Sequence, residues 1–406
     1  MIQSALLIIF EAVFFMLTLG LFIPIMVFFV ECTAALFSRR QLVWKAMESR
    51  PRVDVLVPAH NEASGITATI KSLLPQLIAQ DRLVVIADNC DDETAVIART
   101  LGATVIERYD HNHWGKGYAL DYALGFIAVD LPEVVVMIDA DCIVAPDAIE
   151  RLVSLAYATA RPVQASYLMK QPFNPGSKDA VSLLAVIVKN LVRPSGLYQL
   201  GVPCLLTGSG MAFPWSTLSK VSLASGSIAE DMQLAVELAI AGHTPVFCSE
   251  AKVTALLPQQ KQVAKSQRRR WEHGHLQILL TQVPRLLKAA VRQKRFELLA
   301  IALDLCVPPL SLLVLLWTVA MVGALSIGGL NGSWTLTIIL IIEGLLVTLS
   351  TISAWAKFGR ADISLQTLLT VPLYILWKIS LYFAFLVQPQ TKWIRTERDK
   401  VDEPQP

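Results

Sequence analysis

Acidic residues lie at the ends of apolar segments in this chain, where carboxylates can bind a metal ion or move a proton. Asp139 and Asp141 follow the apolar run 134–138, with one residue between them. Two carboxylates at this spacing make an oxygen site suited to Mg²⁺ or Mn²⁺, and such an ion neutralises a diphosphate. An acidic turn or a helix N-cap explains such a short motif equally well. The pattern alone therefore leaves a metal site and a structural turn as alternatives.

Two further acidic motifs also have a structural and a chemical interpretation. Asp88 begins an acidic segment at 88–92, where such residues end a strand and cap the next helix; the chemical alternative is a hydrogen bond to a nucleobase. Glu230 and Asp231 open a predicted helix, where acids complement the helix dipole. A carboxylate there also acts as a general base when a substrate hydroxyl lies within hydrogen-bond reach.

Two motifs carry the complementary positive charge. Lys116 lies between two glycines at the start of a predicted helix, where backbone N–H groups and an ammonium can meet a phosphate. Gln267, Arg270 and Trp271 share one face of a predicted helix and offer an amide, a guanidinium and an indole to one partner. The alternative is a basic amphipathic helix on anionic lipid headgroups, with the two arginines before Arg270 facing lipid or solvent.

An alternation of strands and helices places the acids at one sheet edge. We predict strands at 53–59, 83–88, 103–107 and 134–138, and helices at 65–78, 93–101, 118–129 and 146–158, the last with proline in its first turn. This order predicts an α/β domain with a mostly parallel sheet, and ligands of such sheets bind outside the carboxyl ends of the strands. Asp88 and Asp139 end the second and fourth strands, so we expect them to face the same ligand.

The composition indicates a membrane protein. Of 406 residues, 54% are hydrophobic and only 17% are charged, against about 25% in soluble domains. The 35 basic and 33 acidic residues nearly cancel, which argues against nucleic-acid binding by bulk charge. The six cysteines have no metal-site spacing and fit a reducing compartment.

Apolar segments long enough to cross a bilayer lie at both ends of the chain. Residues 1–36 are predicted to hold a retained transmembrane helix, because no basic residue precedes the uncharged stretch 12–30. A C-terminal region at 297–388 is predicted to hold two or three spans: 305–327, 334–355 and a weaker candidate at 363–387, which Lys378 interrupts and Pro372 would kink. A polar tail at 389–406 follows.

Basic residues flank the central region on both sides, and the positive-inside rule therefore makes this region cytosolic. They are Arg39, Arg40, Lys45, Arg50 and Arg52 after the first span, and Arg285, Lys288, Arg292, Lys294 and Arg295 before the second. We expect a multi-pass protein of the cell (inner) membrane. Four full spans would put the basic tail outside, so either 363–387 is re-entrant or interfacial, or the tail breaks the rule.

Taken in order, these motifs resemble those of the membrane-embedded family 2 glycosyltransferases, the group of cellulose, chitin, hyaluronan and poly-N-acetylglucosamine synthases. The matching residues are Pro58-Ala59-His60-Asn61-Glu62, Asp88, Lys116, Asp139-Ala140-Asp141, Thr207-Gly208-Ser209-Gly210, Glu230-Asp231 and Gln267-x-x-Arg270-Trp271. The resemblance implies a GT-A nucleotide-diphosphosugar domain at 53–258, inserted between transmembrane helices. Interfacial helices at 259–296 would carry the Gln-x-x-Arg-Trp motif.

The resemblance also implies a role for each motif. Asp231 would be the catalytic base, and Asp139 and Asp141 would hold Mg²⁺ or Mn²⁺. Nucleotide-sugar binding would fall to Pro58, Glu62, Asp88, Lys116, Asp139, Gln267, Arg270 and Trp271. Acceptor binding would fall to Thr207, Gly208, Ser209, Gly210, Glu230 and Trp271. The family's more aromatic version of 207–210 is absent here, which leaves the acceptor open.

The expected reaction is inverting transfer from a UDP-sugar to a growing β-linked polysaccharide. Inversion needs one in-line attack by an acceptor hydroxyl and one base, while cations stabilise the departing diphosphate. The first alternative is non-processive transfer to a membrane lipid. The second is an inactive membrane scaffold with a degenerate transferase domain, against which the complete set of acids argues. The expected partners are the donor, a carbohydrate or lipid-linked acceptor, the bilayer and export proteins, but no nucleic acid.

Overall fold

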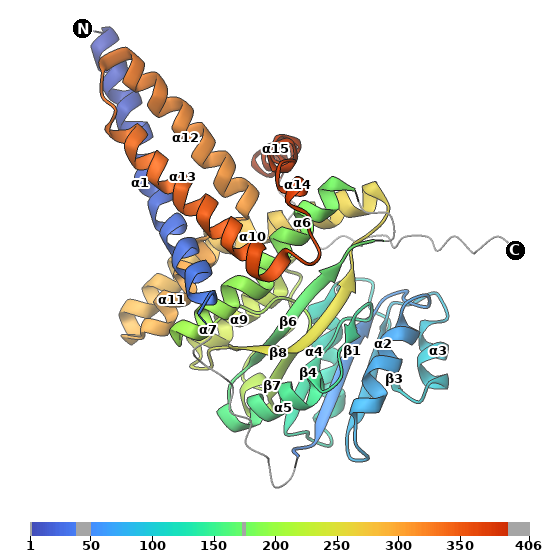
Figure 1. The fold of residues 1–406 in the computed structure, drawn as a ribbon. Coiled ribbons are helices and arrows are strands. Elements are labelled where there is room, and N and C mark those ends of the chain that lie inside the picture. The colour runs from blue at the N-terminus through green and yellow to red at the C-terminus, as the bar shows by residue number, and fades with distance from the viewer. Residues whose placement is uncertain (1, 38–49, 173–175, 389–406) are drawn as a thin grey trace, which may run out of the picture.

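The computed structural model describes residues 2–37, 50–172 and 176–388. The predicted polar tail at 389–406 and three of the predicted basic residues, Arg39, Arg40 and Lys45, lie outside these ranges. The N-terminal helix α1 (Ile2–Ala35) covers the first predicted span. An α/β domain follows it, and a second group of helices ends the chain (Figure 1).

A mixed sheet of eight strands forms the centre of the α/β domain (Figure 1). Its strands are β1 (Val53–Ala59), β2 (Arg82–Asp88), β3 (Thr104–Arg108), β4 (Val134–Met137), β5 (Ile143–Val144), β6 (Val163–Lys170), β7 (Met211–Pro214) and β8 (Val246–Leu256), in the order β3-β2-β1-β4-β7-β6-β8-β5. The four predicted strands are confirmed to within one residue at each end. They pair in parallel, but β7 runs antiparallel to both β4 and β6. Strands β6 and β8 pair in parallel, whereas β5 pairs antiparallel with β8. Four of the seven strand pairs are parallel, so the prediction of a mostly parallel sheet is confirmed, with β5 and β7 as the antiparallel exceptions.

Alternate side chains of the central strands enter two hydrophobic cores. On β4, Val134 and Val136 pack into one core, whereas Val135 and Met137 pack into the other. Strands buried on both faces have continuous apolar sequences, which is why this segment is easy to find in the sequence. The helices of the domain are α2 (Ile66–Leu73), α3 (Thr94–Thr100), α4 (Lys116–Ile127), α5 (Ala148–Thr159), α6 (Ser177–Ile187), α7 (Arg193–Leu200), α8 (Trp215–Leu218) and α9 (Glu230–Ile240), with a 3₁₀ turn η1 (Leu74–Gln76) and a π-helical turn η2 (Val188–Val192).

Prolines account for two corrections to the predicted helices. The helix predicted at 65–78 ends at Leu73, and Pro75 lies in the following 3₁₀ turn, since proline has no N–H for the α-helical ladder. The helix predicted at 146–158 begins at Ala148, so Pro146 is not in its first turn. Asp147, which lies between Pro146 and Ala148, has a positive φ of 62°, and this backbone conformation is incompatible with an α-helix.

The C-terminal part consists of helices only. They are α10 (Lys261–Gln293), α11 (Phe296–Cys306), α12 (Leu310–Asn331), α13 (Thr335–Ala354), the π-helical turn η3 (Trp355–Gly359), α14 (Leu365–Leu368) and α15 (Val371–Val387). The span predicted at 305–327 begins at Leu310 instead, because Pro308 and Pro309 separate it from α11. The interfacial helices predicted at 259–296 are one continuous helix, α10, for most of that range.

Four helical segments of the described chain are long and apolar enough to cross a membrane: Ile9–Ala35, Lys178–Leu200, Leu310–Asn331 and Thr335–Gly359. Three of them, α1, α12 and α13, rise together from one end of the α/β domain (Figure 1). Lys178–Leu200 is instead mostly buried within the protein. The weak fourth candidate is only the short helix α15 (Val371–Val387), and Pro372 lies in its first turn rather than kinking it. Figure 1 views α15 nearly along its axis, while the three long helices are seen from the side.

A buried ion cluster joins the base of these helices to the α/β domain. The guanidinium of Arg193 on α7 lies 2.6 Å from Glu31 on α1 and 2.5 Å from Asp304 on α11. All three side chains are buried. Breaking such a cluster by removing one partner leaves buried charge uncompensated, so it fixes how these three helices meet.

Helices α1 and α7 approach each other so closely at Gly196 that one added methyl group there should have a strong effect. A Cβ added to Gly196 on α7 would lie 1.9 Å from the backbone oxygen of Glu31 on α1. Gly196→Ala should therefore push α1 and α7 apart and lower the free energy of unfolding by about 1–3 kcal/mol. Thermal unfolding of the purified full-length protein measures this. Gly125→Ala on α4 is the control, since no atom lies within 4 Å of the added carbon; equal melting of the two variants would contradict the tight contact.

Candidate active site

A cavity of about 370 Å³ opens at the carboxyl ends of β1, β2 and β4, between the sheet, α9 and α10. It has the size of a site for a small organic ligand. The predicted site residues that line it are Pro58, Glu62, Asp88, Lys116, Asp139, Asp141, Thr207, Gly208, Glu230, Asp231, Gln267, Arg270 and Trp271. The structure therefore brings residues from 58 to 271 to one place. Their individual roles stay predictions.

Lys116 connects the two sides of this cavity. Its ammonium donates hydrogen bonds to the carboxylate of Asp139 and to the backbone carbonyl of Gly208. Burial by itself lowers the pKa of Lys116, but the carboxylates of Asp139 and Glu230 outweigh burial and raise the pKa. Lys116 is therefore a permanent cation at neutral pH. Helix α4 begins at this lysine, two residues before the predicted start, so the side chain and the free N–H groups face the same space.

Two of the predicted acceptor residues support the loop and do not line the cavity. Ser209 is fully buried, and its hydroxyl accepts a hydrogen bond of 3.0 Å from the backbone N–H of Asp139. Gly210 has a φ of +69°, and a Cβ there would lie 2.7 Å from the Cβ of Ala165. The amide of Gln164 donates to the carbonyl of Ser209 at 2.9 Å. These contacts fix the shape of the loop between α7 and β7.

The two residues before them, Thr207 and Gly208, do face the cavity. Gly208 has a φ of +94°, and a Cβ there would lie 3.5 Å from Oδ2 of Asp231. The Oγ1 of Thr207 is buried and has no hydrogen-bond partner within the described residues. This loop thus places Gly208 beside a carboxylate and leaves the hydroxyl of Thr207 unsatisfied.

Asp88 lies at the nucleotide end of the predicted site and is held by a residue that the sequence did not suggest. Arg108 at the end of β3 places its guanidinium 2.6 Å from Oδ1 of Asp88, and both side chains are buried. The Nδ1 of His60 lies 2.7 Å from the carbonyl of Asp88. Burial raises the pKa of Asp88, although Arg108 opposes that rise. The carboxylate is thus fixed in orientation at the edge of the cavity.

Asp139 and Asp141 form the acidic pair expected to hold a metal. Ligand atoms of Asp139, Asp141 and Cys142 all lie within 4.8 Å of one another. Burial raises the pKa of the Cys142 thiol well above its ordinary value, so the thiol is protonated and is a poor ligand. Two carboxylates without a thiolate make a hard oxygen donor set, which fits Mg²⁺ or Mn²⁺ better than zinc.

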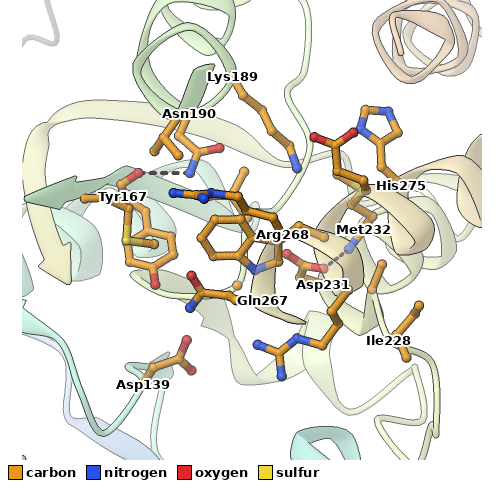
Figure 2. A pocket seen from close by; sticks show the side chains of 18 of the residues that line it. Asp139, Tyr167, Lys189, Asn190, Ile228, Asp231, Met232, Gln267, Arg268 and His275 are labelled. Carbon is orange, nitrogen blue, oxygen red and sulfur yellow. Dashed lines mark hydrogen bonds between the residues drawn. The ribbon is translucent and has the colours of Figure 1, made fainter. Parts of the chain in front are cut away.

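Glu230 and Asp231 occupy the first turn of α9, as predicted. The Oδ1 of Asp231 accepts a hydrogen bond of 2.8 Å from the N–H of Met232, and the carboxylate points into the cavity (Figure 2). Burial, followed by the charge of Asp231, raises the pKa of Glu230 to about 7. Glu230 and Asp231 are thus neighbouring acids in different environments. Enzymes often use such a difference to make one acid a proton donor and the other a proton acceptor.

Helix α10 supplies the third wall of the cavity. Gln267, Arg270 and Trp271 line it from one helix face, as their spacing predicts. Arg268 also lines the cavity and lies 2.7 Å from Asp179 of α6, so the expectation that it faces lipid or solvent is wrong. Its neighbour Arg269 donates to the backbone oxygen of Gln388 beyond α15. The helix is packed between other elements on this face.

Sequence reasoning missed the wall formed by β6, η2 and the C-terminal helices. Its cavity-lining residues include Tyr167, Lys189, Asn190, His275 and Lys378. Lys378 interrupts an apolar segment, and the structure explains it by an ion pair with Glu272 of α10. The segment that carries Lys189 has the apolar composition of a candidate span, so its sequence gives no sign that it lines a site.

Comparisons with known proteins agree with this architecture. One relative is the 4,4'-diaponeurosporenoate glycosyltransferase of Staphylococcus aureus strain N315, 34% identical over 96 residues, which is 23% of this chain and 25% of the relative. The enzyme of the same name from strain USA300 matches with the same identity and coverage. The match therefore spans about a quarter of the length of these curated relatives.

A solved structure extends the similarity to most of the fold. The mannosyltransferase of Pyrobaculum calidifontis, in complex with GDP-Man and Mn²⁺, covers 87% of this chain and 99% of its own with a TM-score of 0.55. Its sequence identity is 19%, so this likeness concerns the fold alone. The α/β domain is the GT-A-like domain that the resemblance implied, with a mixed sheet and with apolar helices flanking it. Residues 51–274, more than half of the chain, match the family described as glycosyltransferase like family 2, and the protein belongs to that family.

Proposed function

We propose that the protein transfers a sugar from a nucleotide-sugar donor to an apolar acceptor that it takes from a membrane. One observation carries this proposal: the cavity that holds the acidic pair also reaches the base of the long apolar helices. Phe28 of α1, Val307 before α12 and Leu310 of α12 line it together with Asp139. An acceptor anchored in lipid can therefore present its head group to the donor without leaving the bilayer. This is the lipid-acceptor alternative of the sequence analysis.

The chemistry requires one base and several cations. Asp231 is positioned to take the proton of an acceptor hydroxyl, since its carboxylate points into the cavity beside Gly208. A single displacement of this kind inverts the anomeric carbon. Arg270 and Lys116 line the same cavity and would stabilise the charge of the departing diphosphate. Trp271, on the same helix face as Arg270, would exclude water from the reacting atoms.

The metal is part of the proposal. Asp139 and Asp141 would hold Mg²⁺ or Mn²⁺, which supplies charge neutralisation to the diphosphate when bound. The mannosyltransferase with the same fold is described with Mn²⁺, in agreement with this donor set. Its nucleotide is GDP, so the UDP expected here depends on the sequence resemblance and on Asp88 and Glu62 at the far end of the cavity.

A polysaccharide synthase is the second candidate. The shared face of Gln267, Arg270 and Trp271 against the cavity favours it, because the resemblance to polymer-forming enzymes includes that motif. Within the described residues, however, only α1, α12 and α13 stand outside the α/β domain as long apolar helices. The curated relatives are named for a discrete compound, 4,4'-diaponeurosporenoate. Both observations favour one sugar on a small acceptor.

The membrane topology is also proposed. The exposed side chains of Arg285, Lys288 and Arg292 lie on α10 before the first C-terminal span, on the side that the positive-inside rule assigns to the cytosol. Nucleotide sugars would reach the cavity from there. Exposed apolar residues of α15, among them Leu373 and Phe383, suit a helix that lies in the membrane interface rather than across it. That placement removes the conflict with a basic tail outside the cell.

The decisive experiment is a donor and product screen with the full-length protein in native membrane vesicles. Radiolabelled UDP- and GDP-sugars are supplied with Mn²⁺, and lipid-extractable products are analysed by mass spectrometry. We expect one sugar unit on an organic-soluble acceptor. A product of many sugar units would support the polymer synthase instead, and consumption of no donor would reject both.

A further inference from the structure

Positive side chains in the cavity differ in whether they have an acidic partner. Six lysine and arginine side chains of the described chain line it, and four of them pair with carboxylates. The pairs are Lys116 with Asp139, Arg193 with Glu31 and Asp304, Arg268 with Asp179, and Lys378 with Glu272. The two others, Arg270 and Lys189, have no ion pair with any described residue. Each is therefore available to a ligand.

The proposed function assigns Arg270 to the diphosphate of the donor. Lys189 lies on a different wall of the cavity and has no role in that proposal. It belongs to the π-helical turn η2, and such turns are frequent at functional sites. Its long side chain extends into the cavity, on the side opposite Asp139 (Figure 2). Burial lowers the pKa of Lys189, and the carboxylates of Asp231, Glu272 and Asp304 oppose this only from beyond ion-pair distance. A partly buried ammonium without a directly paired carboxylate is stabilised when a ligand supplies that charge.

Neutral polar groups beside Lys189 also lack partners. The side-chain amide of Asn190 donates to the carbonyl of Tyr167 at 3.0 Å, but its own oxygen is buried without a hydrogen-bond partner among the described residues. Thr207 presents a buried hydroxyl in the same condition. Burial, aided by the charges of Lys189 and Arg193, lowers the pKa of His275 to about 3, so this neighbour is neutral. The hydroxyl of Thr207 can donate a hydrogen bond to an anionic group, whereas the oxygen of Asn190 needs a donor such as water or a hydroxyl of the ligand.

Apolar surface lies beside this polar group. Phe28, Val307 and Leu310 line the cavity where the long helices meet the α/β domain. A ligand of this part of the cavity thus needs an acidic end for Lys189 and an apolar body for the helices. A nucleoside diphosphate has no such body.

We propose that Lys189 binds an anionic oxygen group, carboxylate or phosphate, on the head of the apolar acceptor and so holds the hydroxyl of that acceptor beside Asp231. This inference rests on the proposed function and names the acceptor class of the same site. It divides the two unpaired cations between the two substrates, with Arg270 on the donor diphosphate and Lys189 on the acidic acceptor. An apolar alcohol without an acidic group would bind in the cavity less tightly.

A binding experiment tests this without sugar transfer. Full-length protein in phosphatidylcholine nanodiscs is titrated with cis-parinaric acid, a fluorescent polyene acid, and with parinaryl alcohol. We expect the acid to bind at least about tenfold more tightly, since a charge-assisted hydrogen bond contributes on that order. Lys189→Met should abolish the preference and Lys189→Arg should keep most of it. Competition by farnesyl phosphate against farnesol then tells whether phosphate serves as well as carboxylate.

Lys178→Met is the matched control, because Lys178 is an exposed lysine at the start of the same helical segment and lies over the ring of Trp377. It should keep the preference for the acid. Equal binding of acid and alcohol by the unaltered protein, binding of neither, or an unchanged preference in Lys189→Met would overturn the inference. Weaker Mn²⁺-dependent UDP binding in Lys189→Met with the preference intact would also overturn it, by assigning the lysine to the donor. If the unaltered protein shows the preference but transfers no sugar, the proposed function fails and the anion site remains.

Discussion

Asp231→Asn should abolish sugar transfer while nucleotide binding survives. The amide keeps the size of the carboxylate and can still accept the hydrogen bond from the N–H of Met232, so α9 should begin as before. It cannot take a proton from an acceptor hydroxyl. Loss of a general base lowers the rate by roughly 10²–10⁴-fold, and we expect a decrease of at least that order. Transfer of radiolabelled sugar measures the rate, and titration calorimetry with UDP and Mn²⁺ measures binding.

Two substitutions on the same helix make this result specific. Glu237→Gln changes an acid that lies outside the main cavity and accepts a hydrogen bond from Gln233, so it should leave transfer unchanged. Glu230→Gln probes the neighbouring acid, whose raised pKa of about 7 makes it the only serious rival as base on α9. Full activity of Asp231→Asn together with loss in Glu230→Gln would move the catalytic role to Glu230.

Removal of the metal should have the second-largest effect. Asp141→Asn takes away one of two carboxylates expected to bind Mg²⁺ or Mn²⁺, and it spares Asp139, which also bonds to Lys116. A divalent ion contributes several kcal/mol of charge stabilisation, so we expect transfer to fall roughly 10²-fold or more. Treatment of the unaltered protein with a chelator should have the same effect and be reversed by added Mn²⁺. Calorimetry should show weaker UDP binding in both cases.

A nearby aspartate offers a control for this prediction. Asp147 lies six residues after Asp141, between β5 and α5, is exposed, and has a positive φ of 62° that asparagine also adopts readily. Asp147→Asn should therefore retain both metal-dependent binding and transfer. Full transfer by the chelator-treated protein would falsify the metal role of the acidic pair, and Lys116 with Arg270 would then have to neutralise the diphosphate alone.

The sequence determined the first half of the sheet and the location of the acids. Strand β4 is a continuous apolar segment that ends at Asp139, and any chain that buries such a segment on both faces must place the acid at the edge. The spacing of Gln267, Arg270 and Trp271 likewise fixed one face of α10. These features depend on local periodicity, which is independent of the remaining chain.

The tertiary structure alone decided which cations have partners. Lys378 was expected to weaken a membrane span, but it pairs with Glu272, which lies 106 positions earlier in the chain. Arg268 was expected on the surface, but it pairs with Asp179. Lys189 came from a segment with the composition of a membrane helix and lines the cavity instead. Charge neutralisation depends on contacts between distant segments, which local periodicity does not encode.

The antiparallel strand β7 shows the same division. The sequence pattern did not predict this strand, and its direction depends on how the preceding segment α6–α7 returns to the sheet. That return carries Lys189 and Asn190 to the wall of the cavity. The sequence by itself thus determined the acidic side of the cavity, proposed for the donor, because strand ends and helix starts position its acids. Only the folded chain decided the opposite side, proposed for the acceptor, because its walls come from segments that are far apart in sequence and meet through burial of apolar surface.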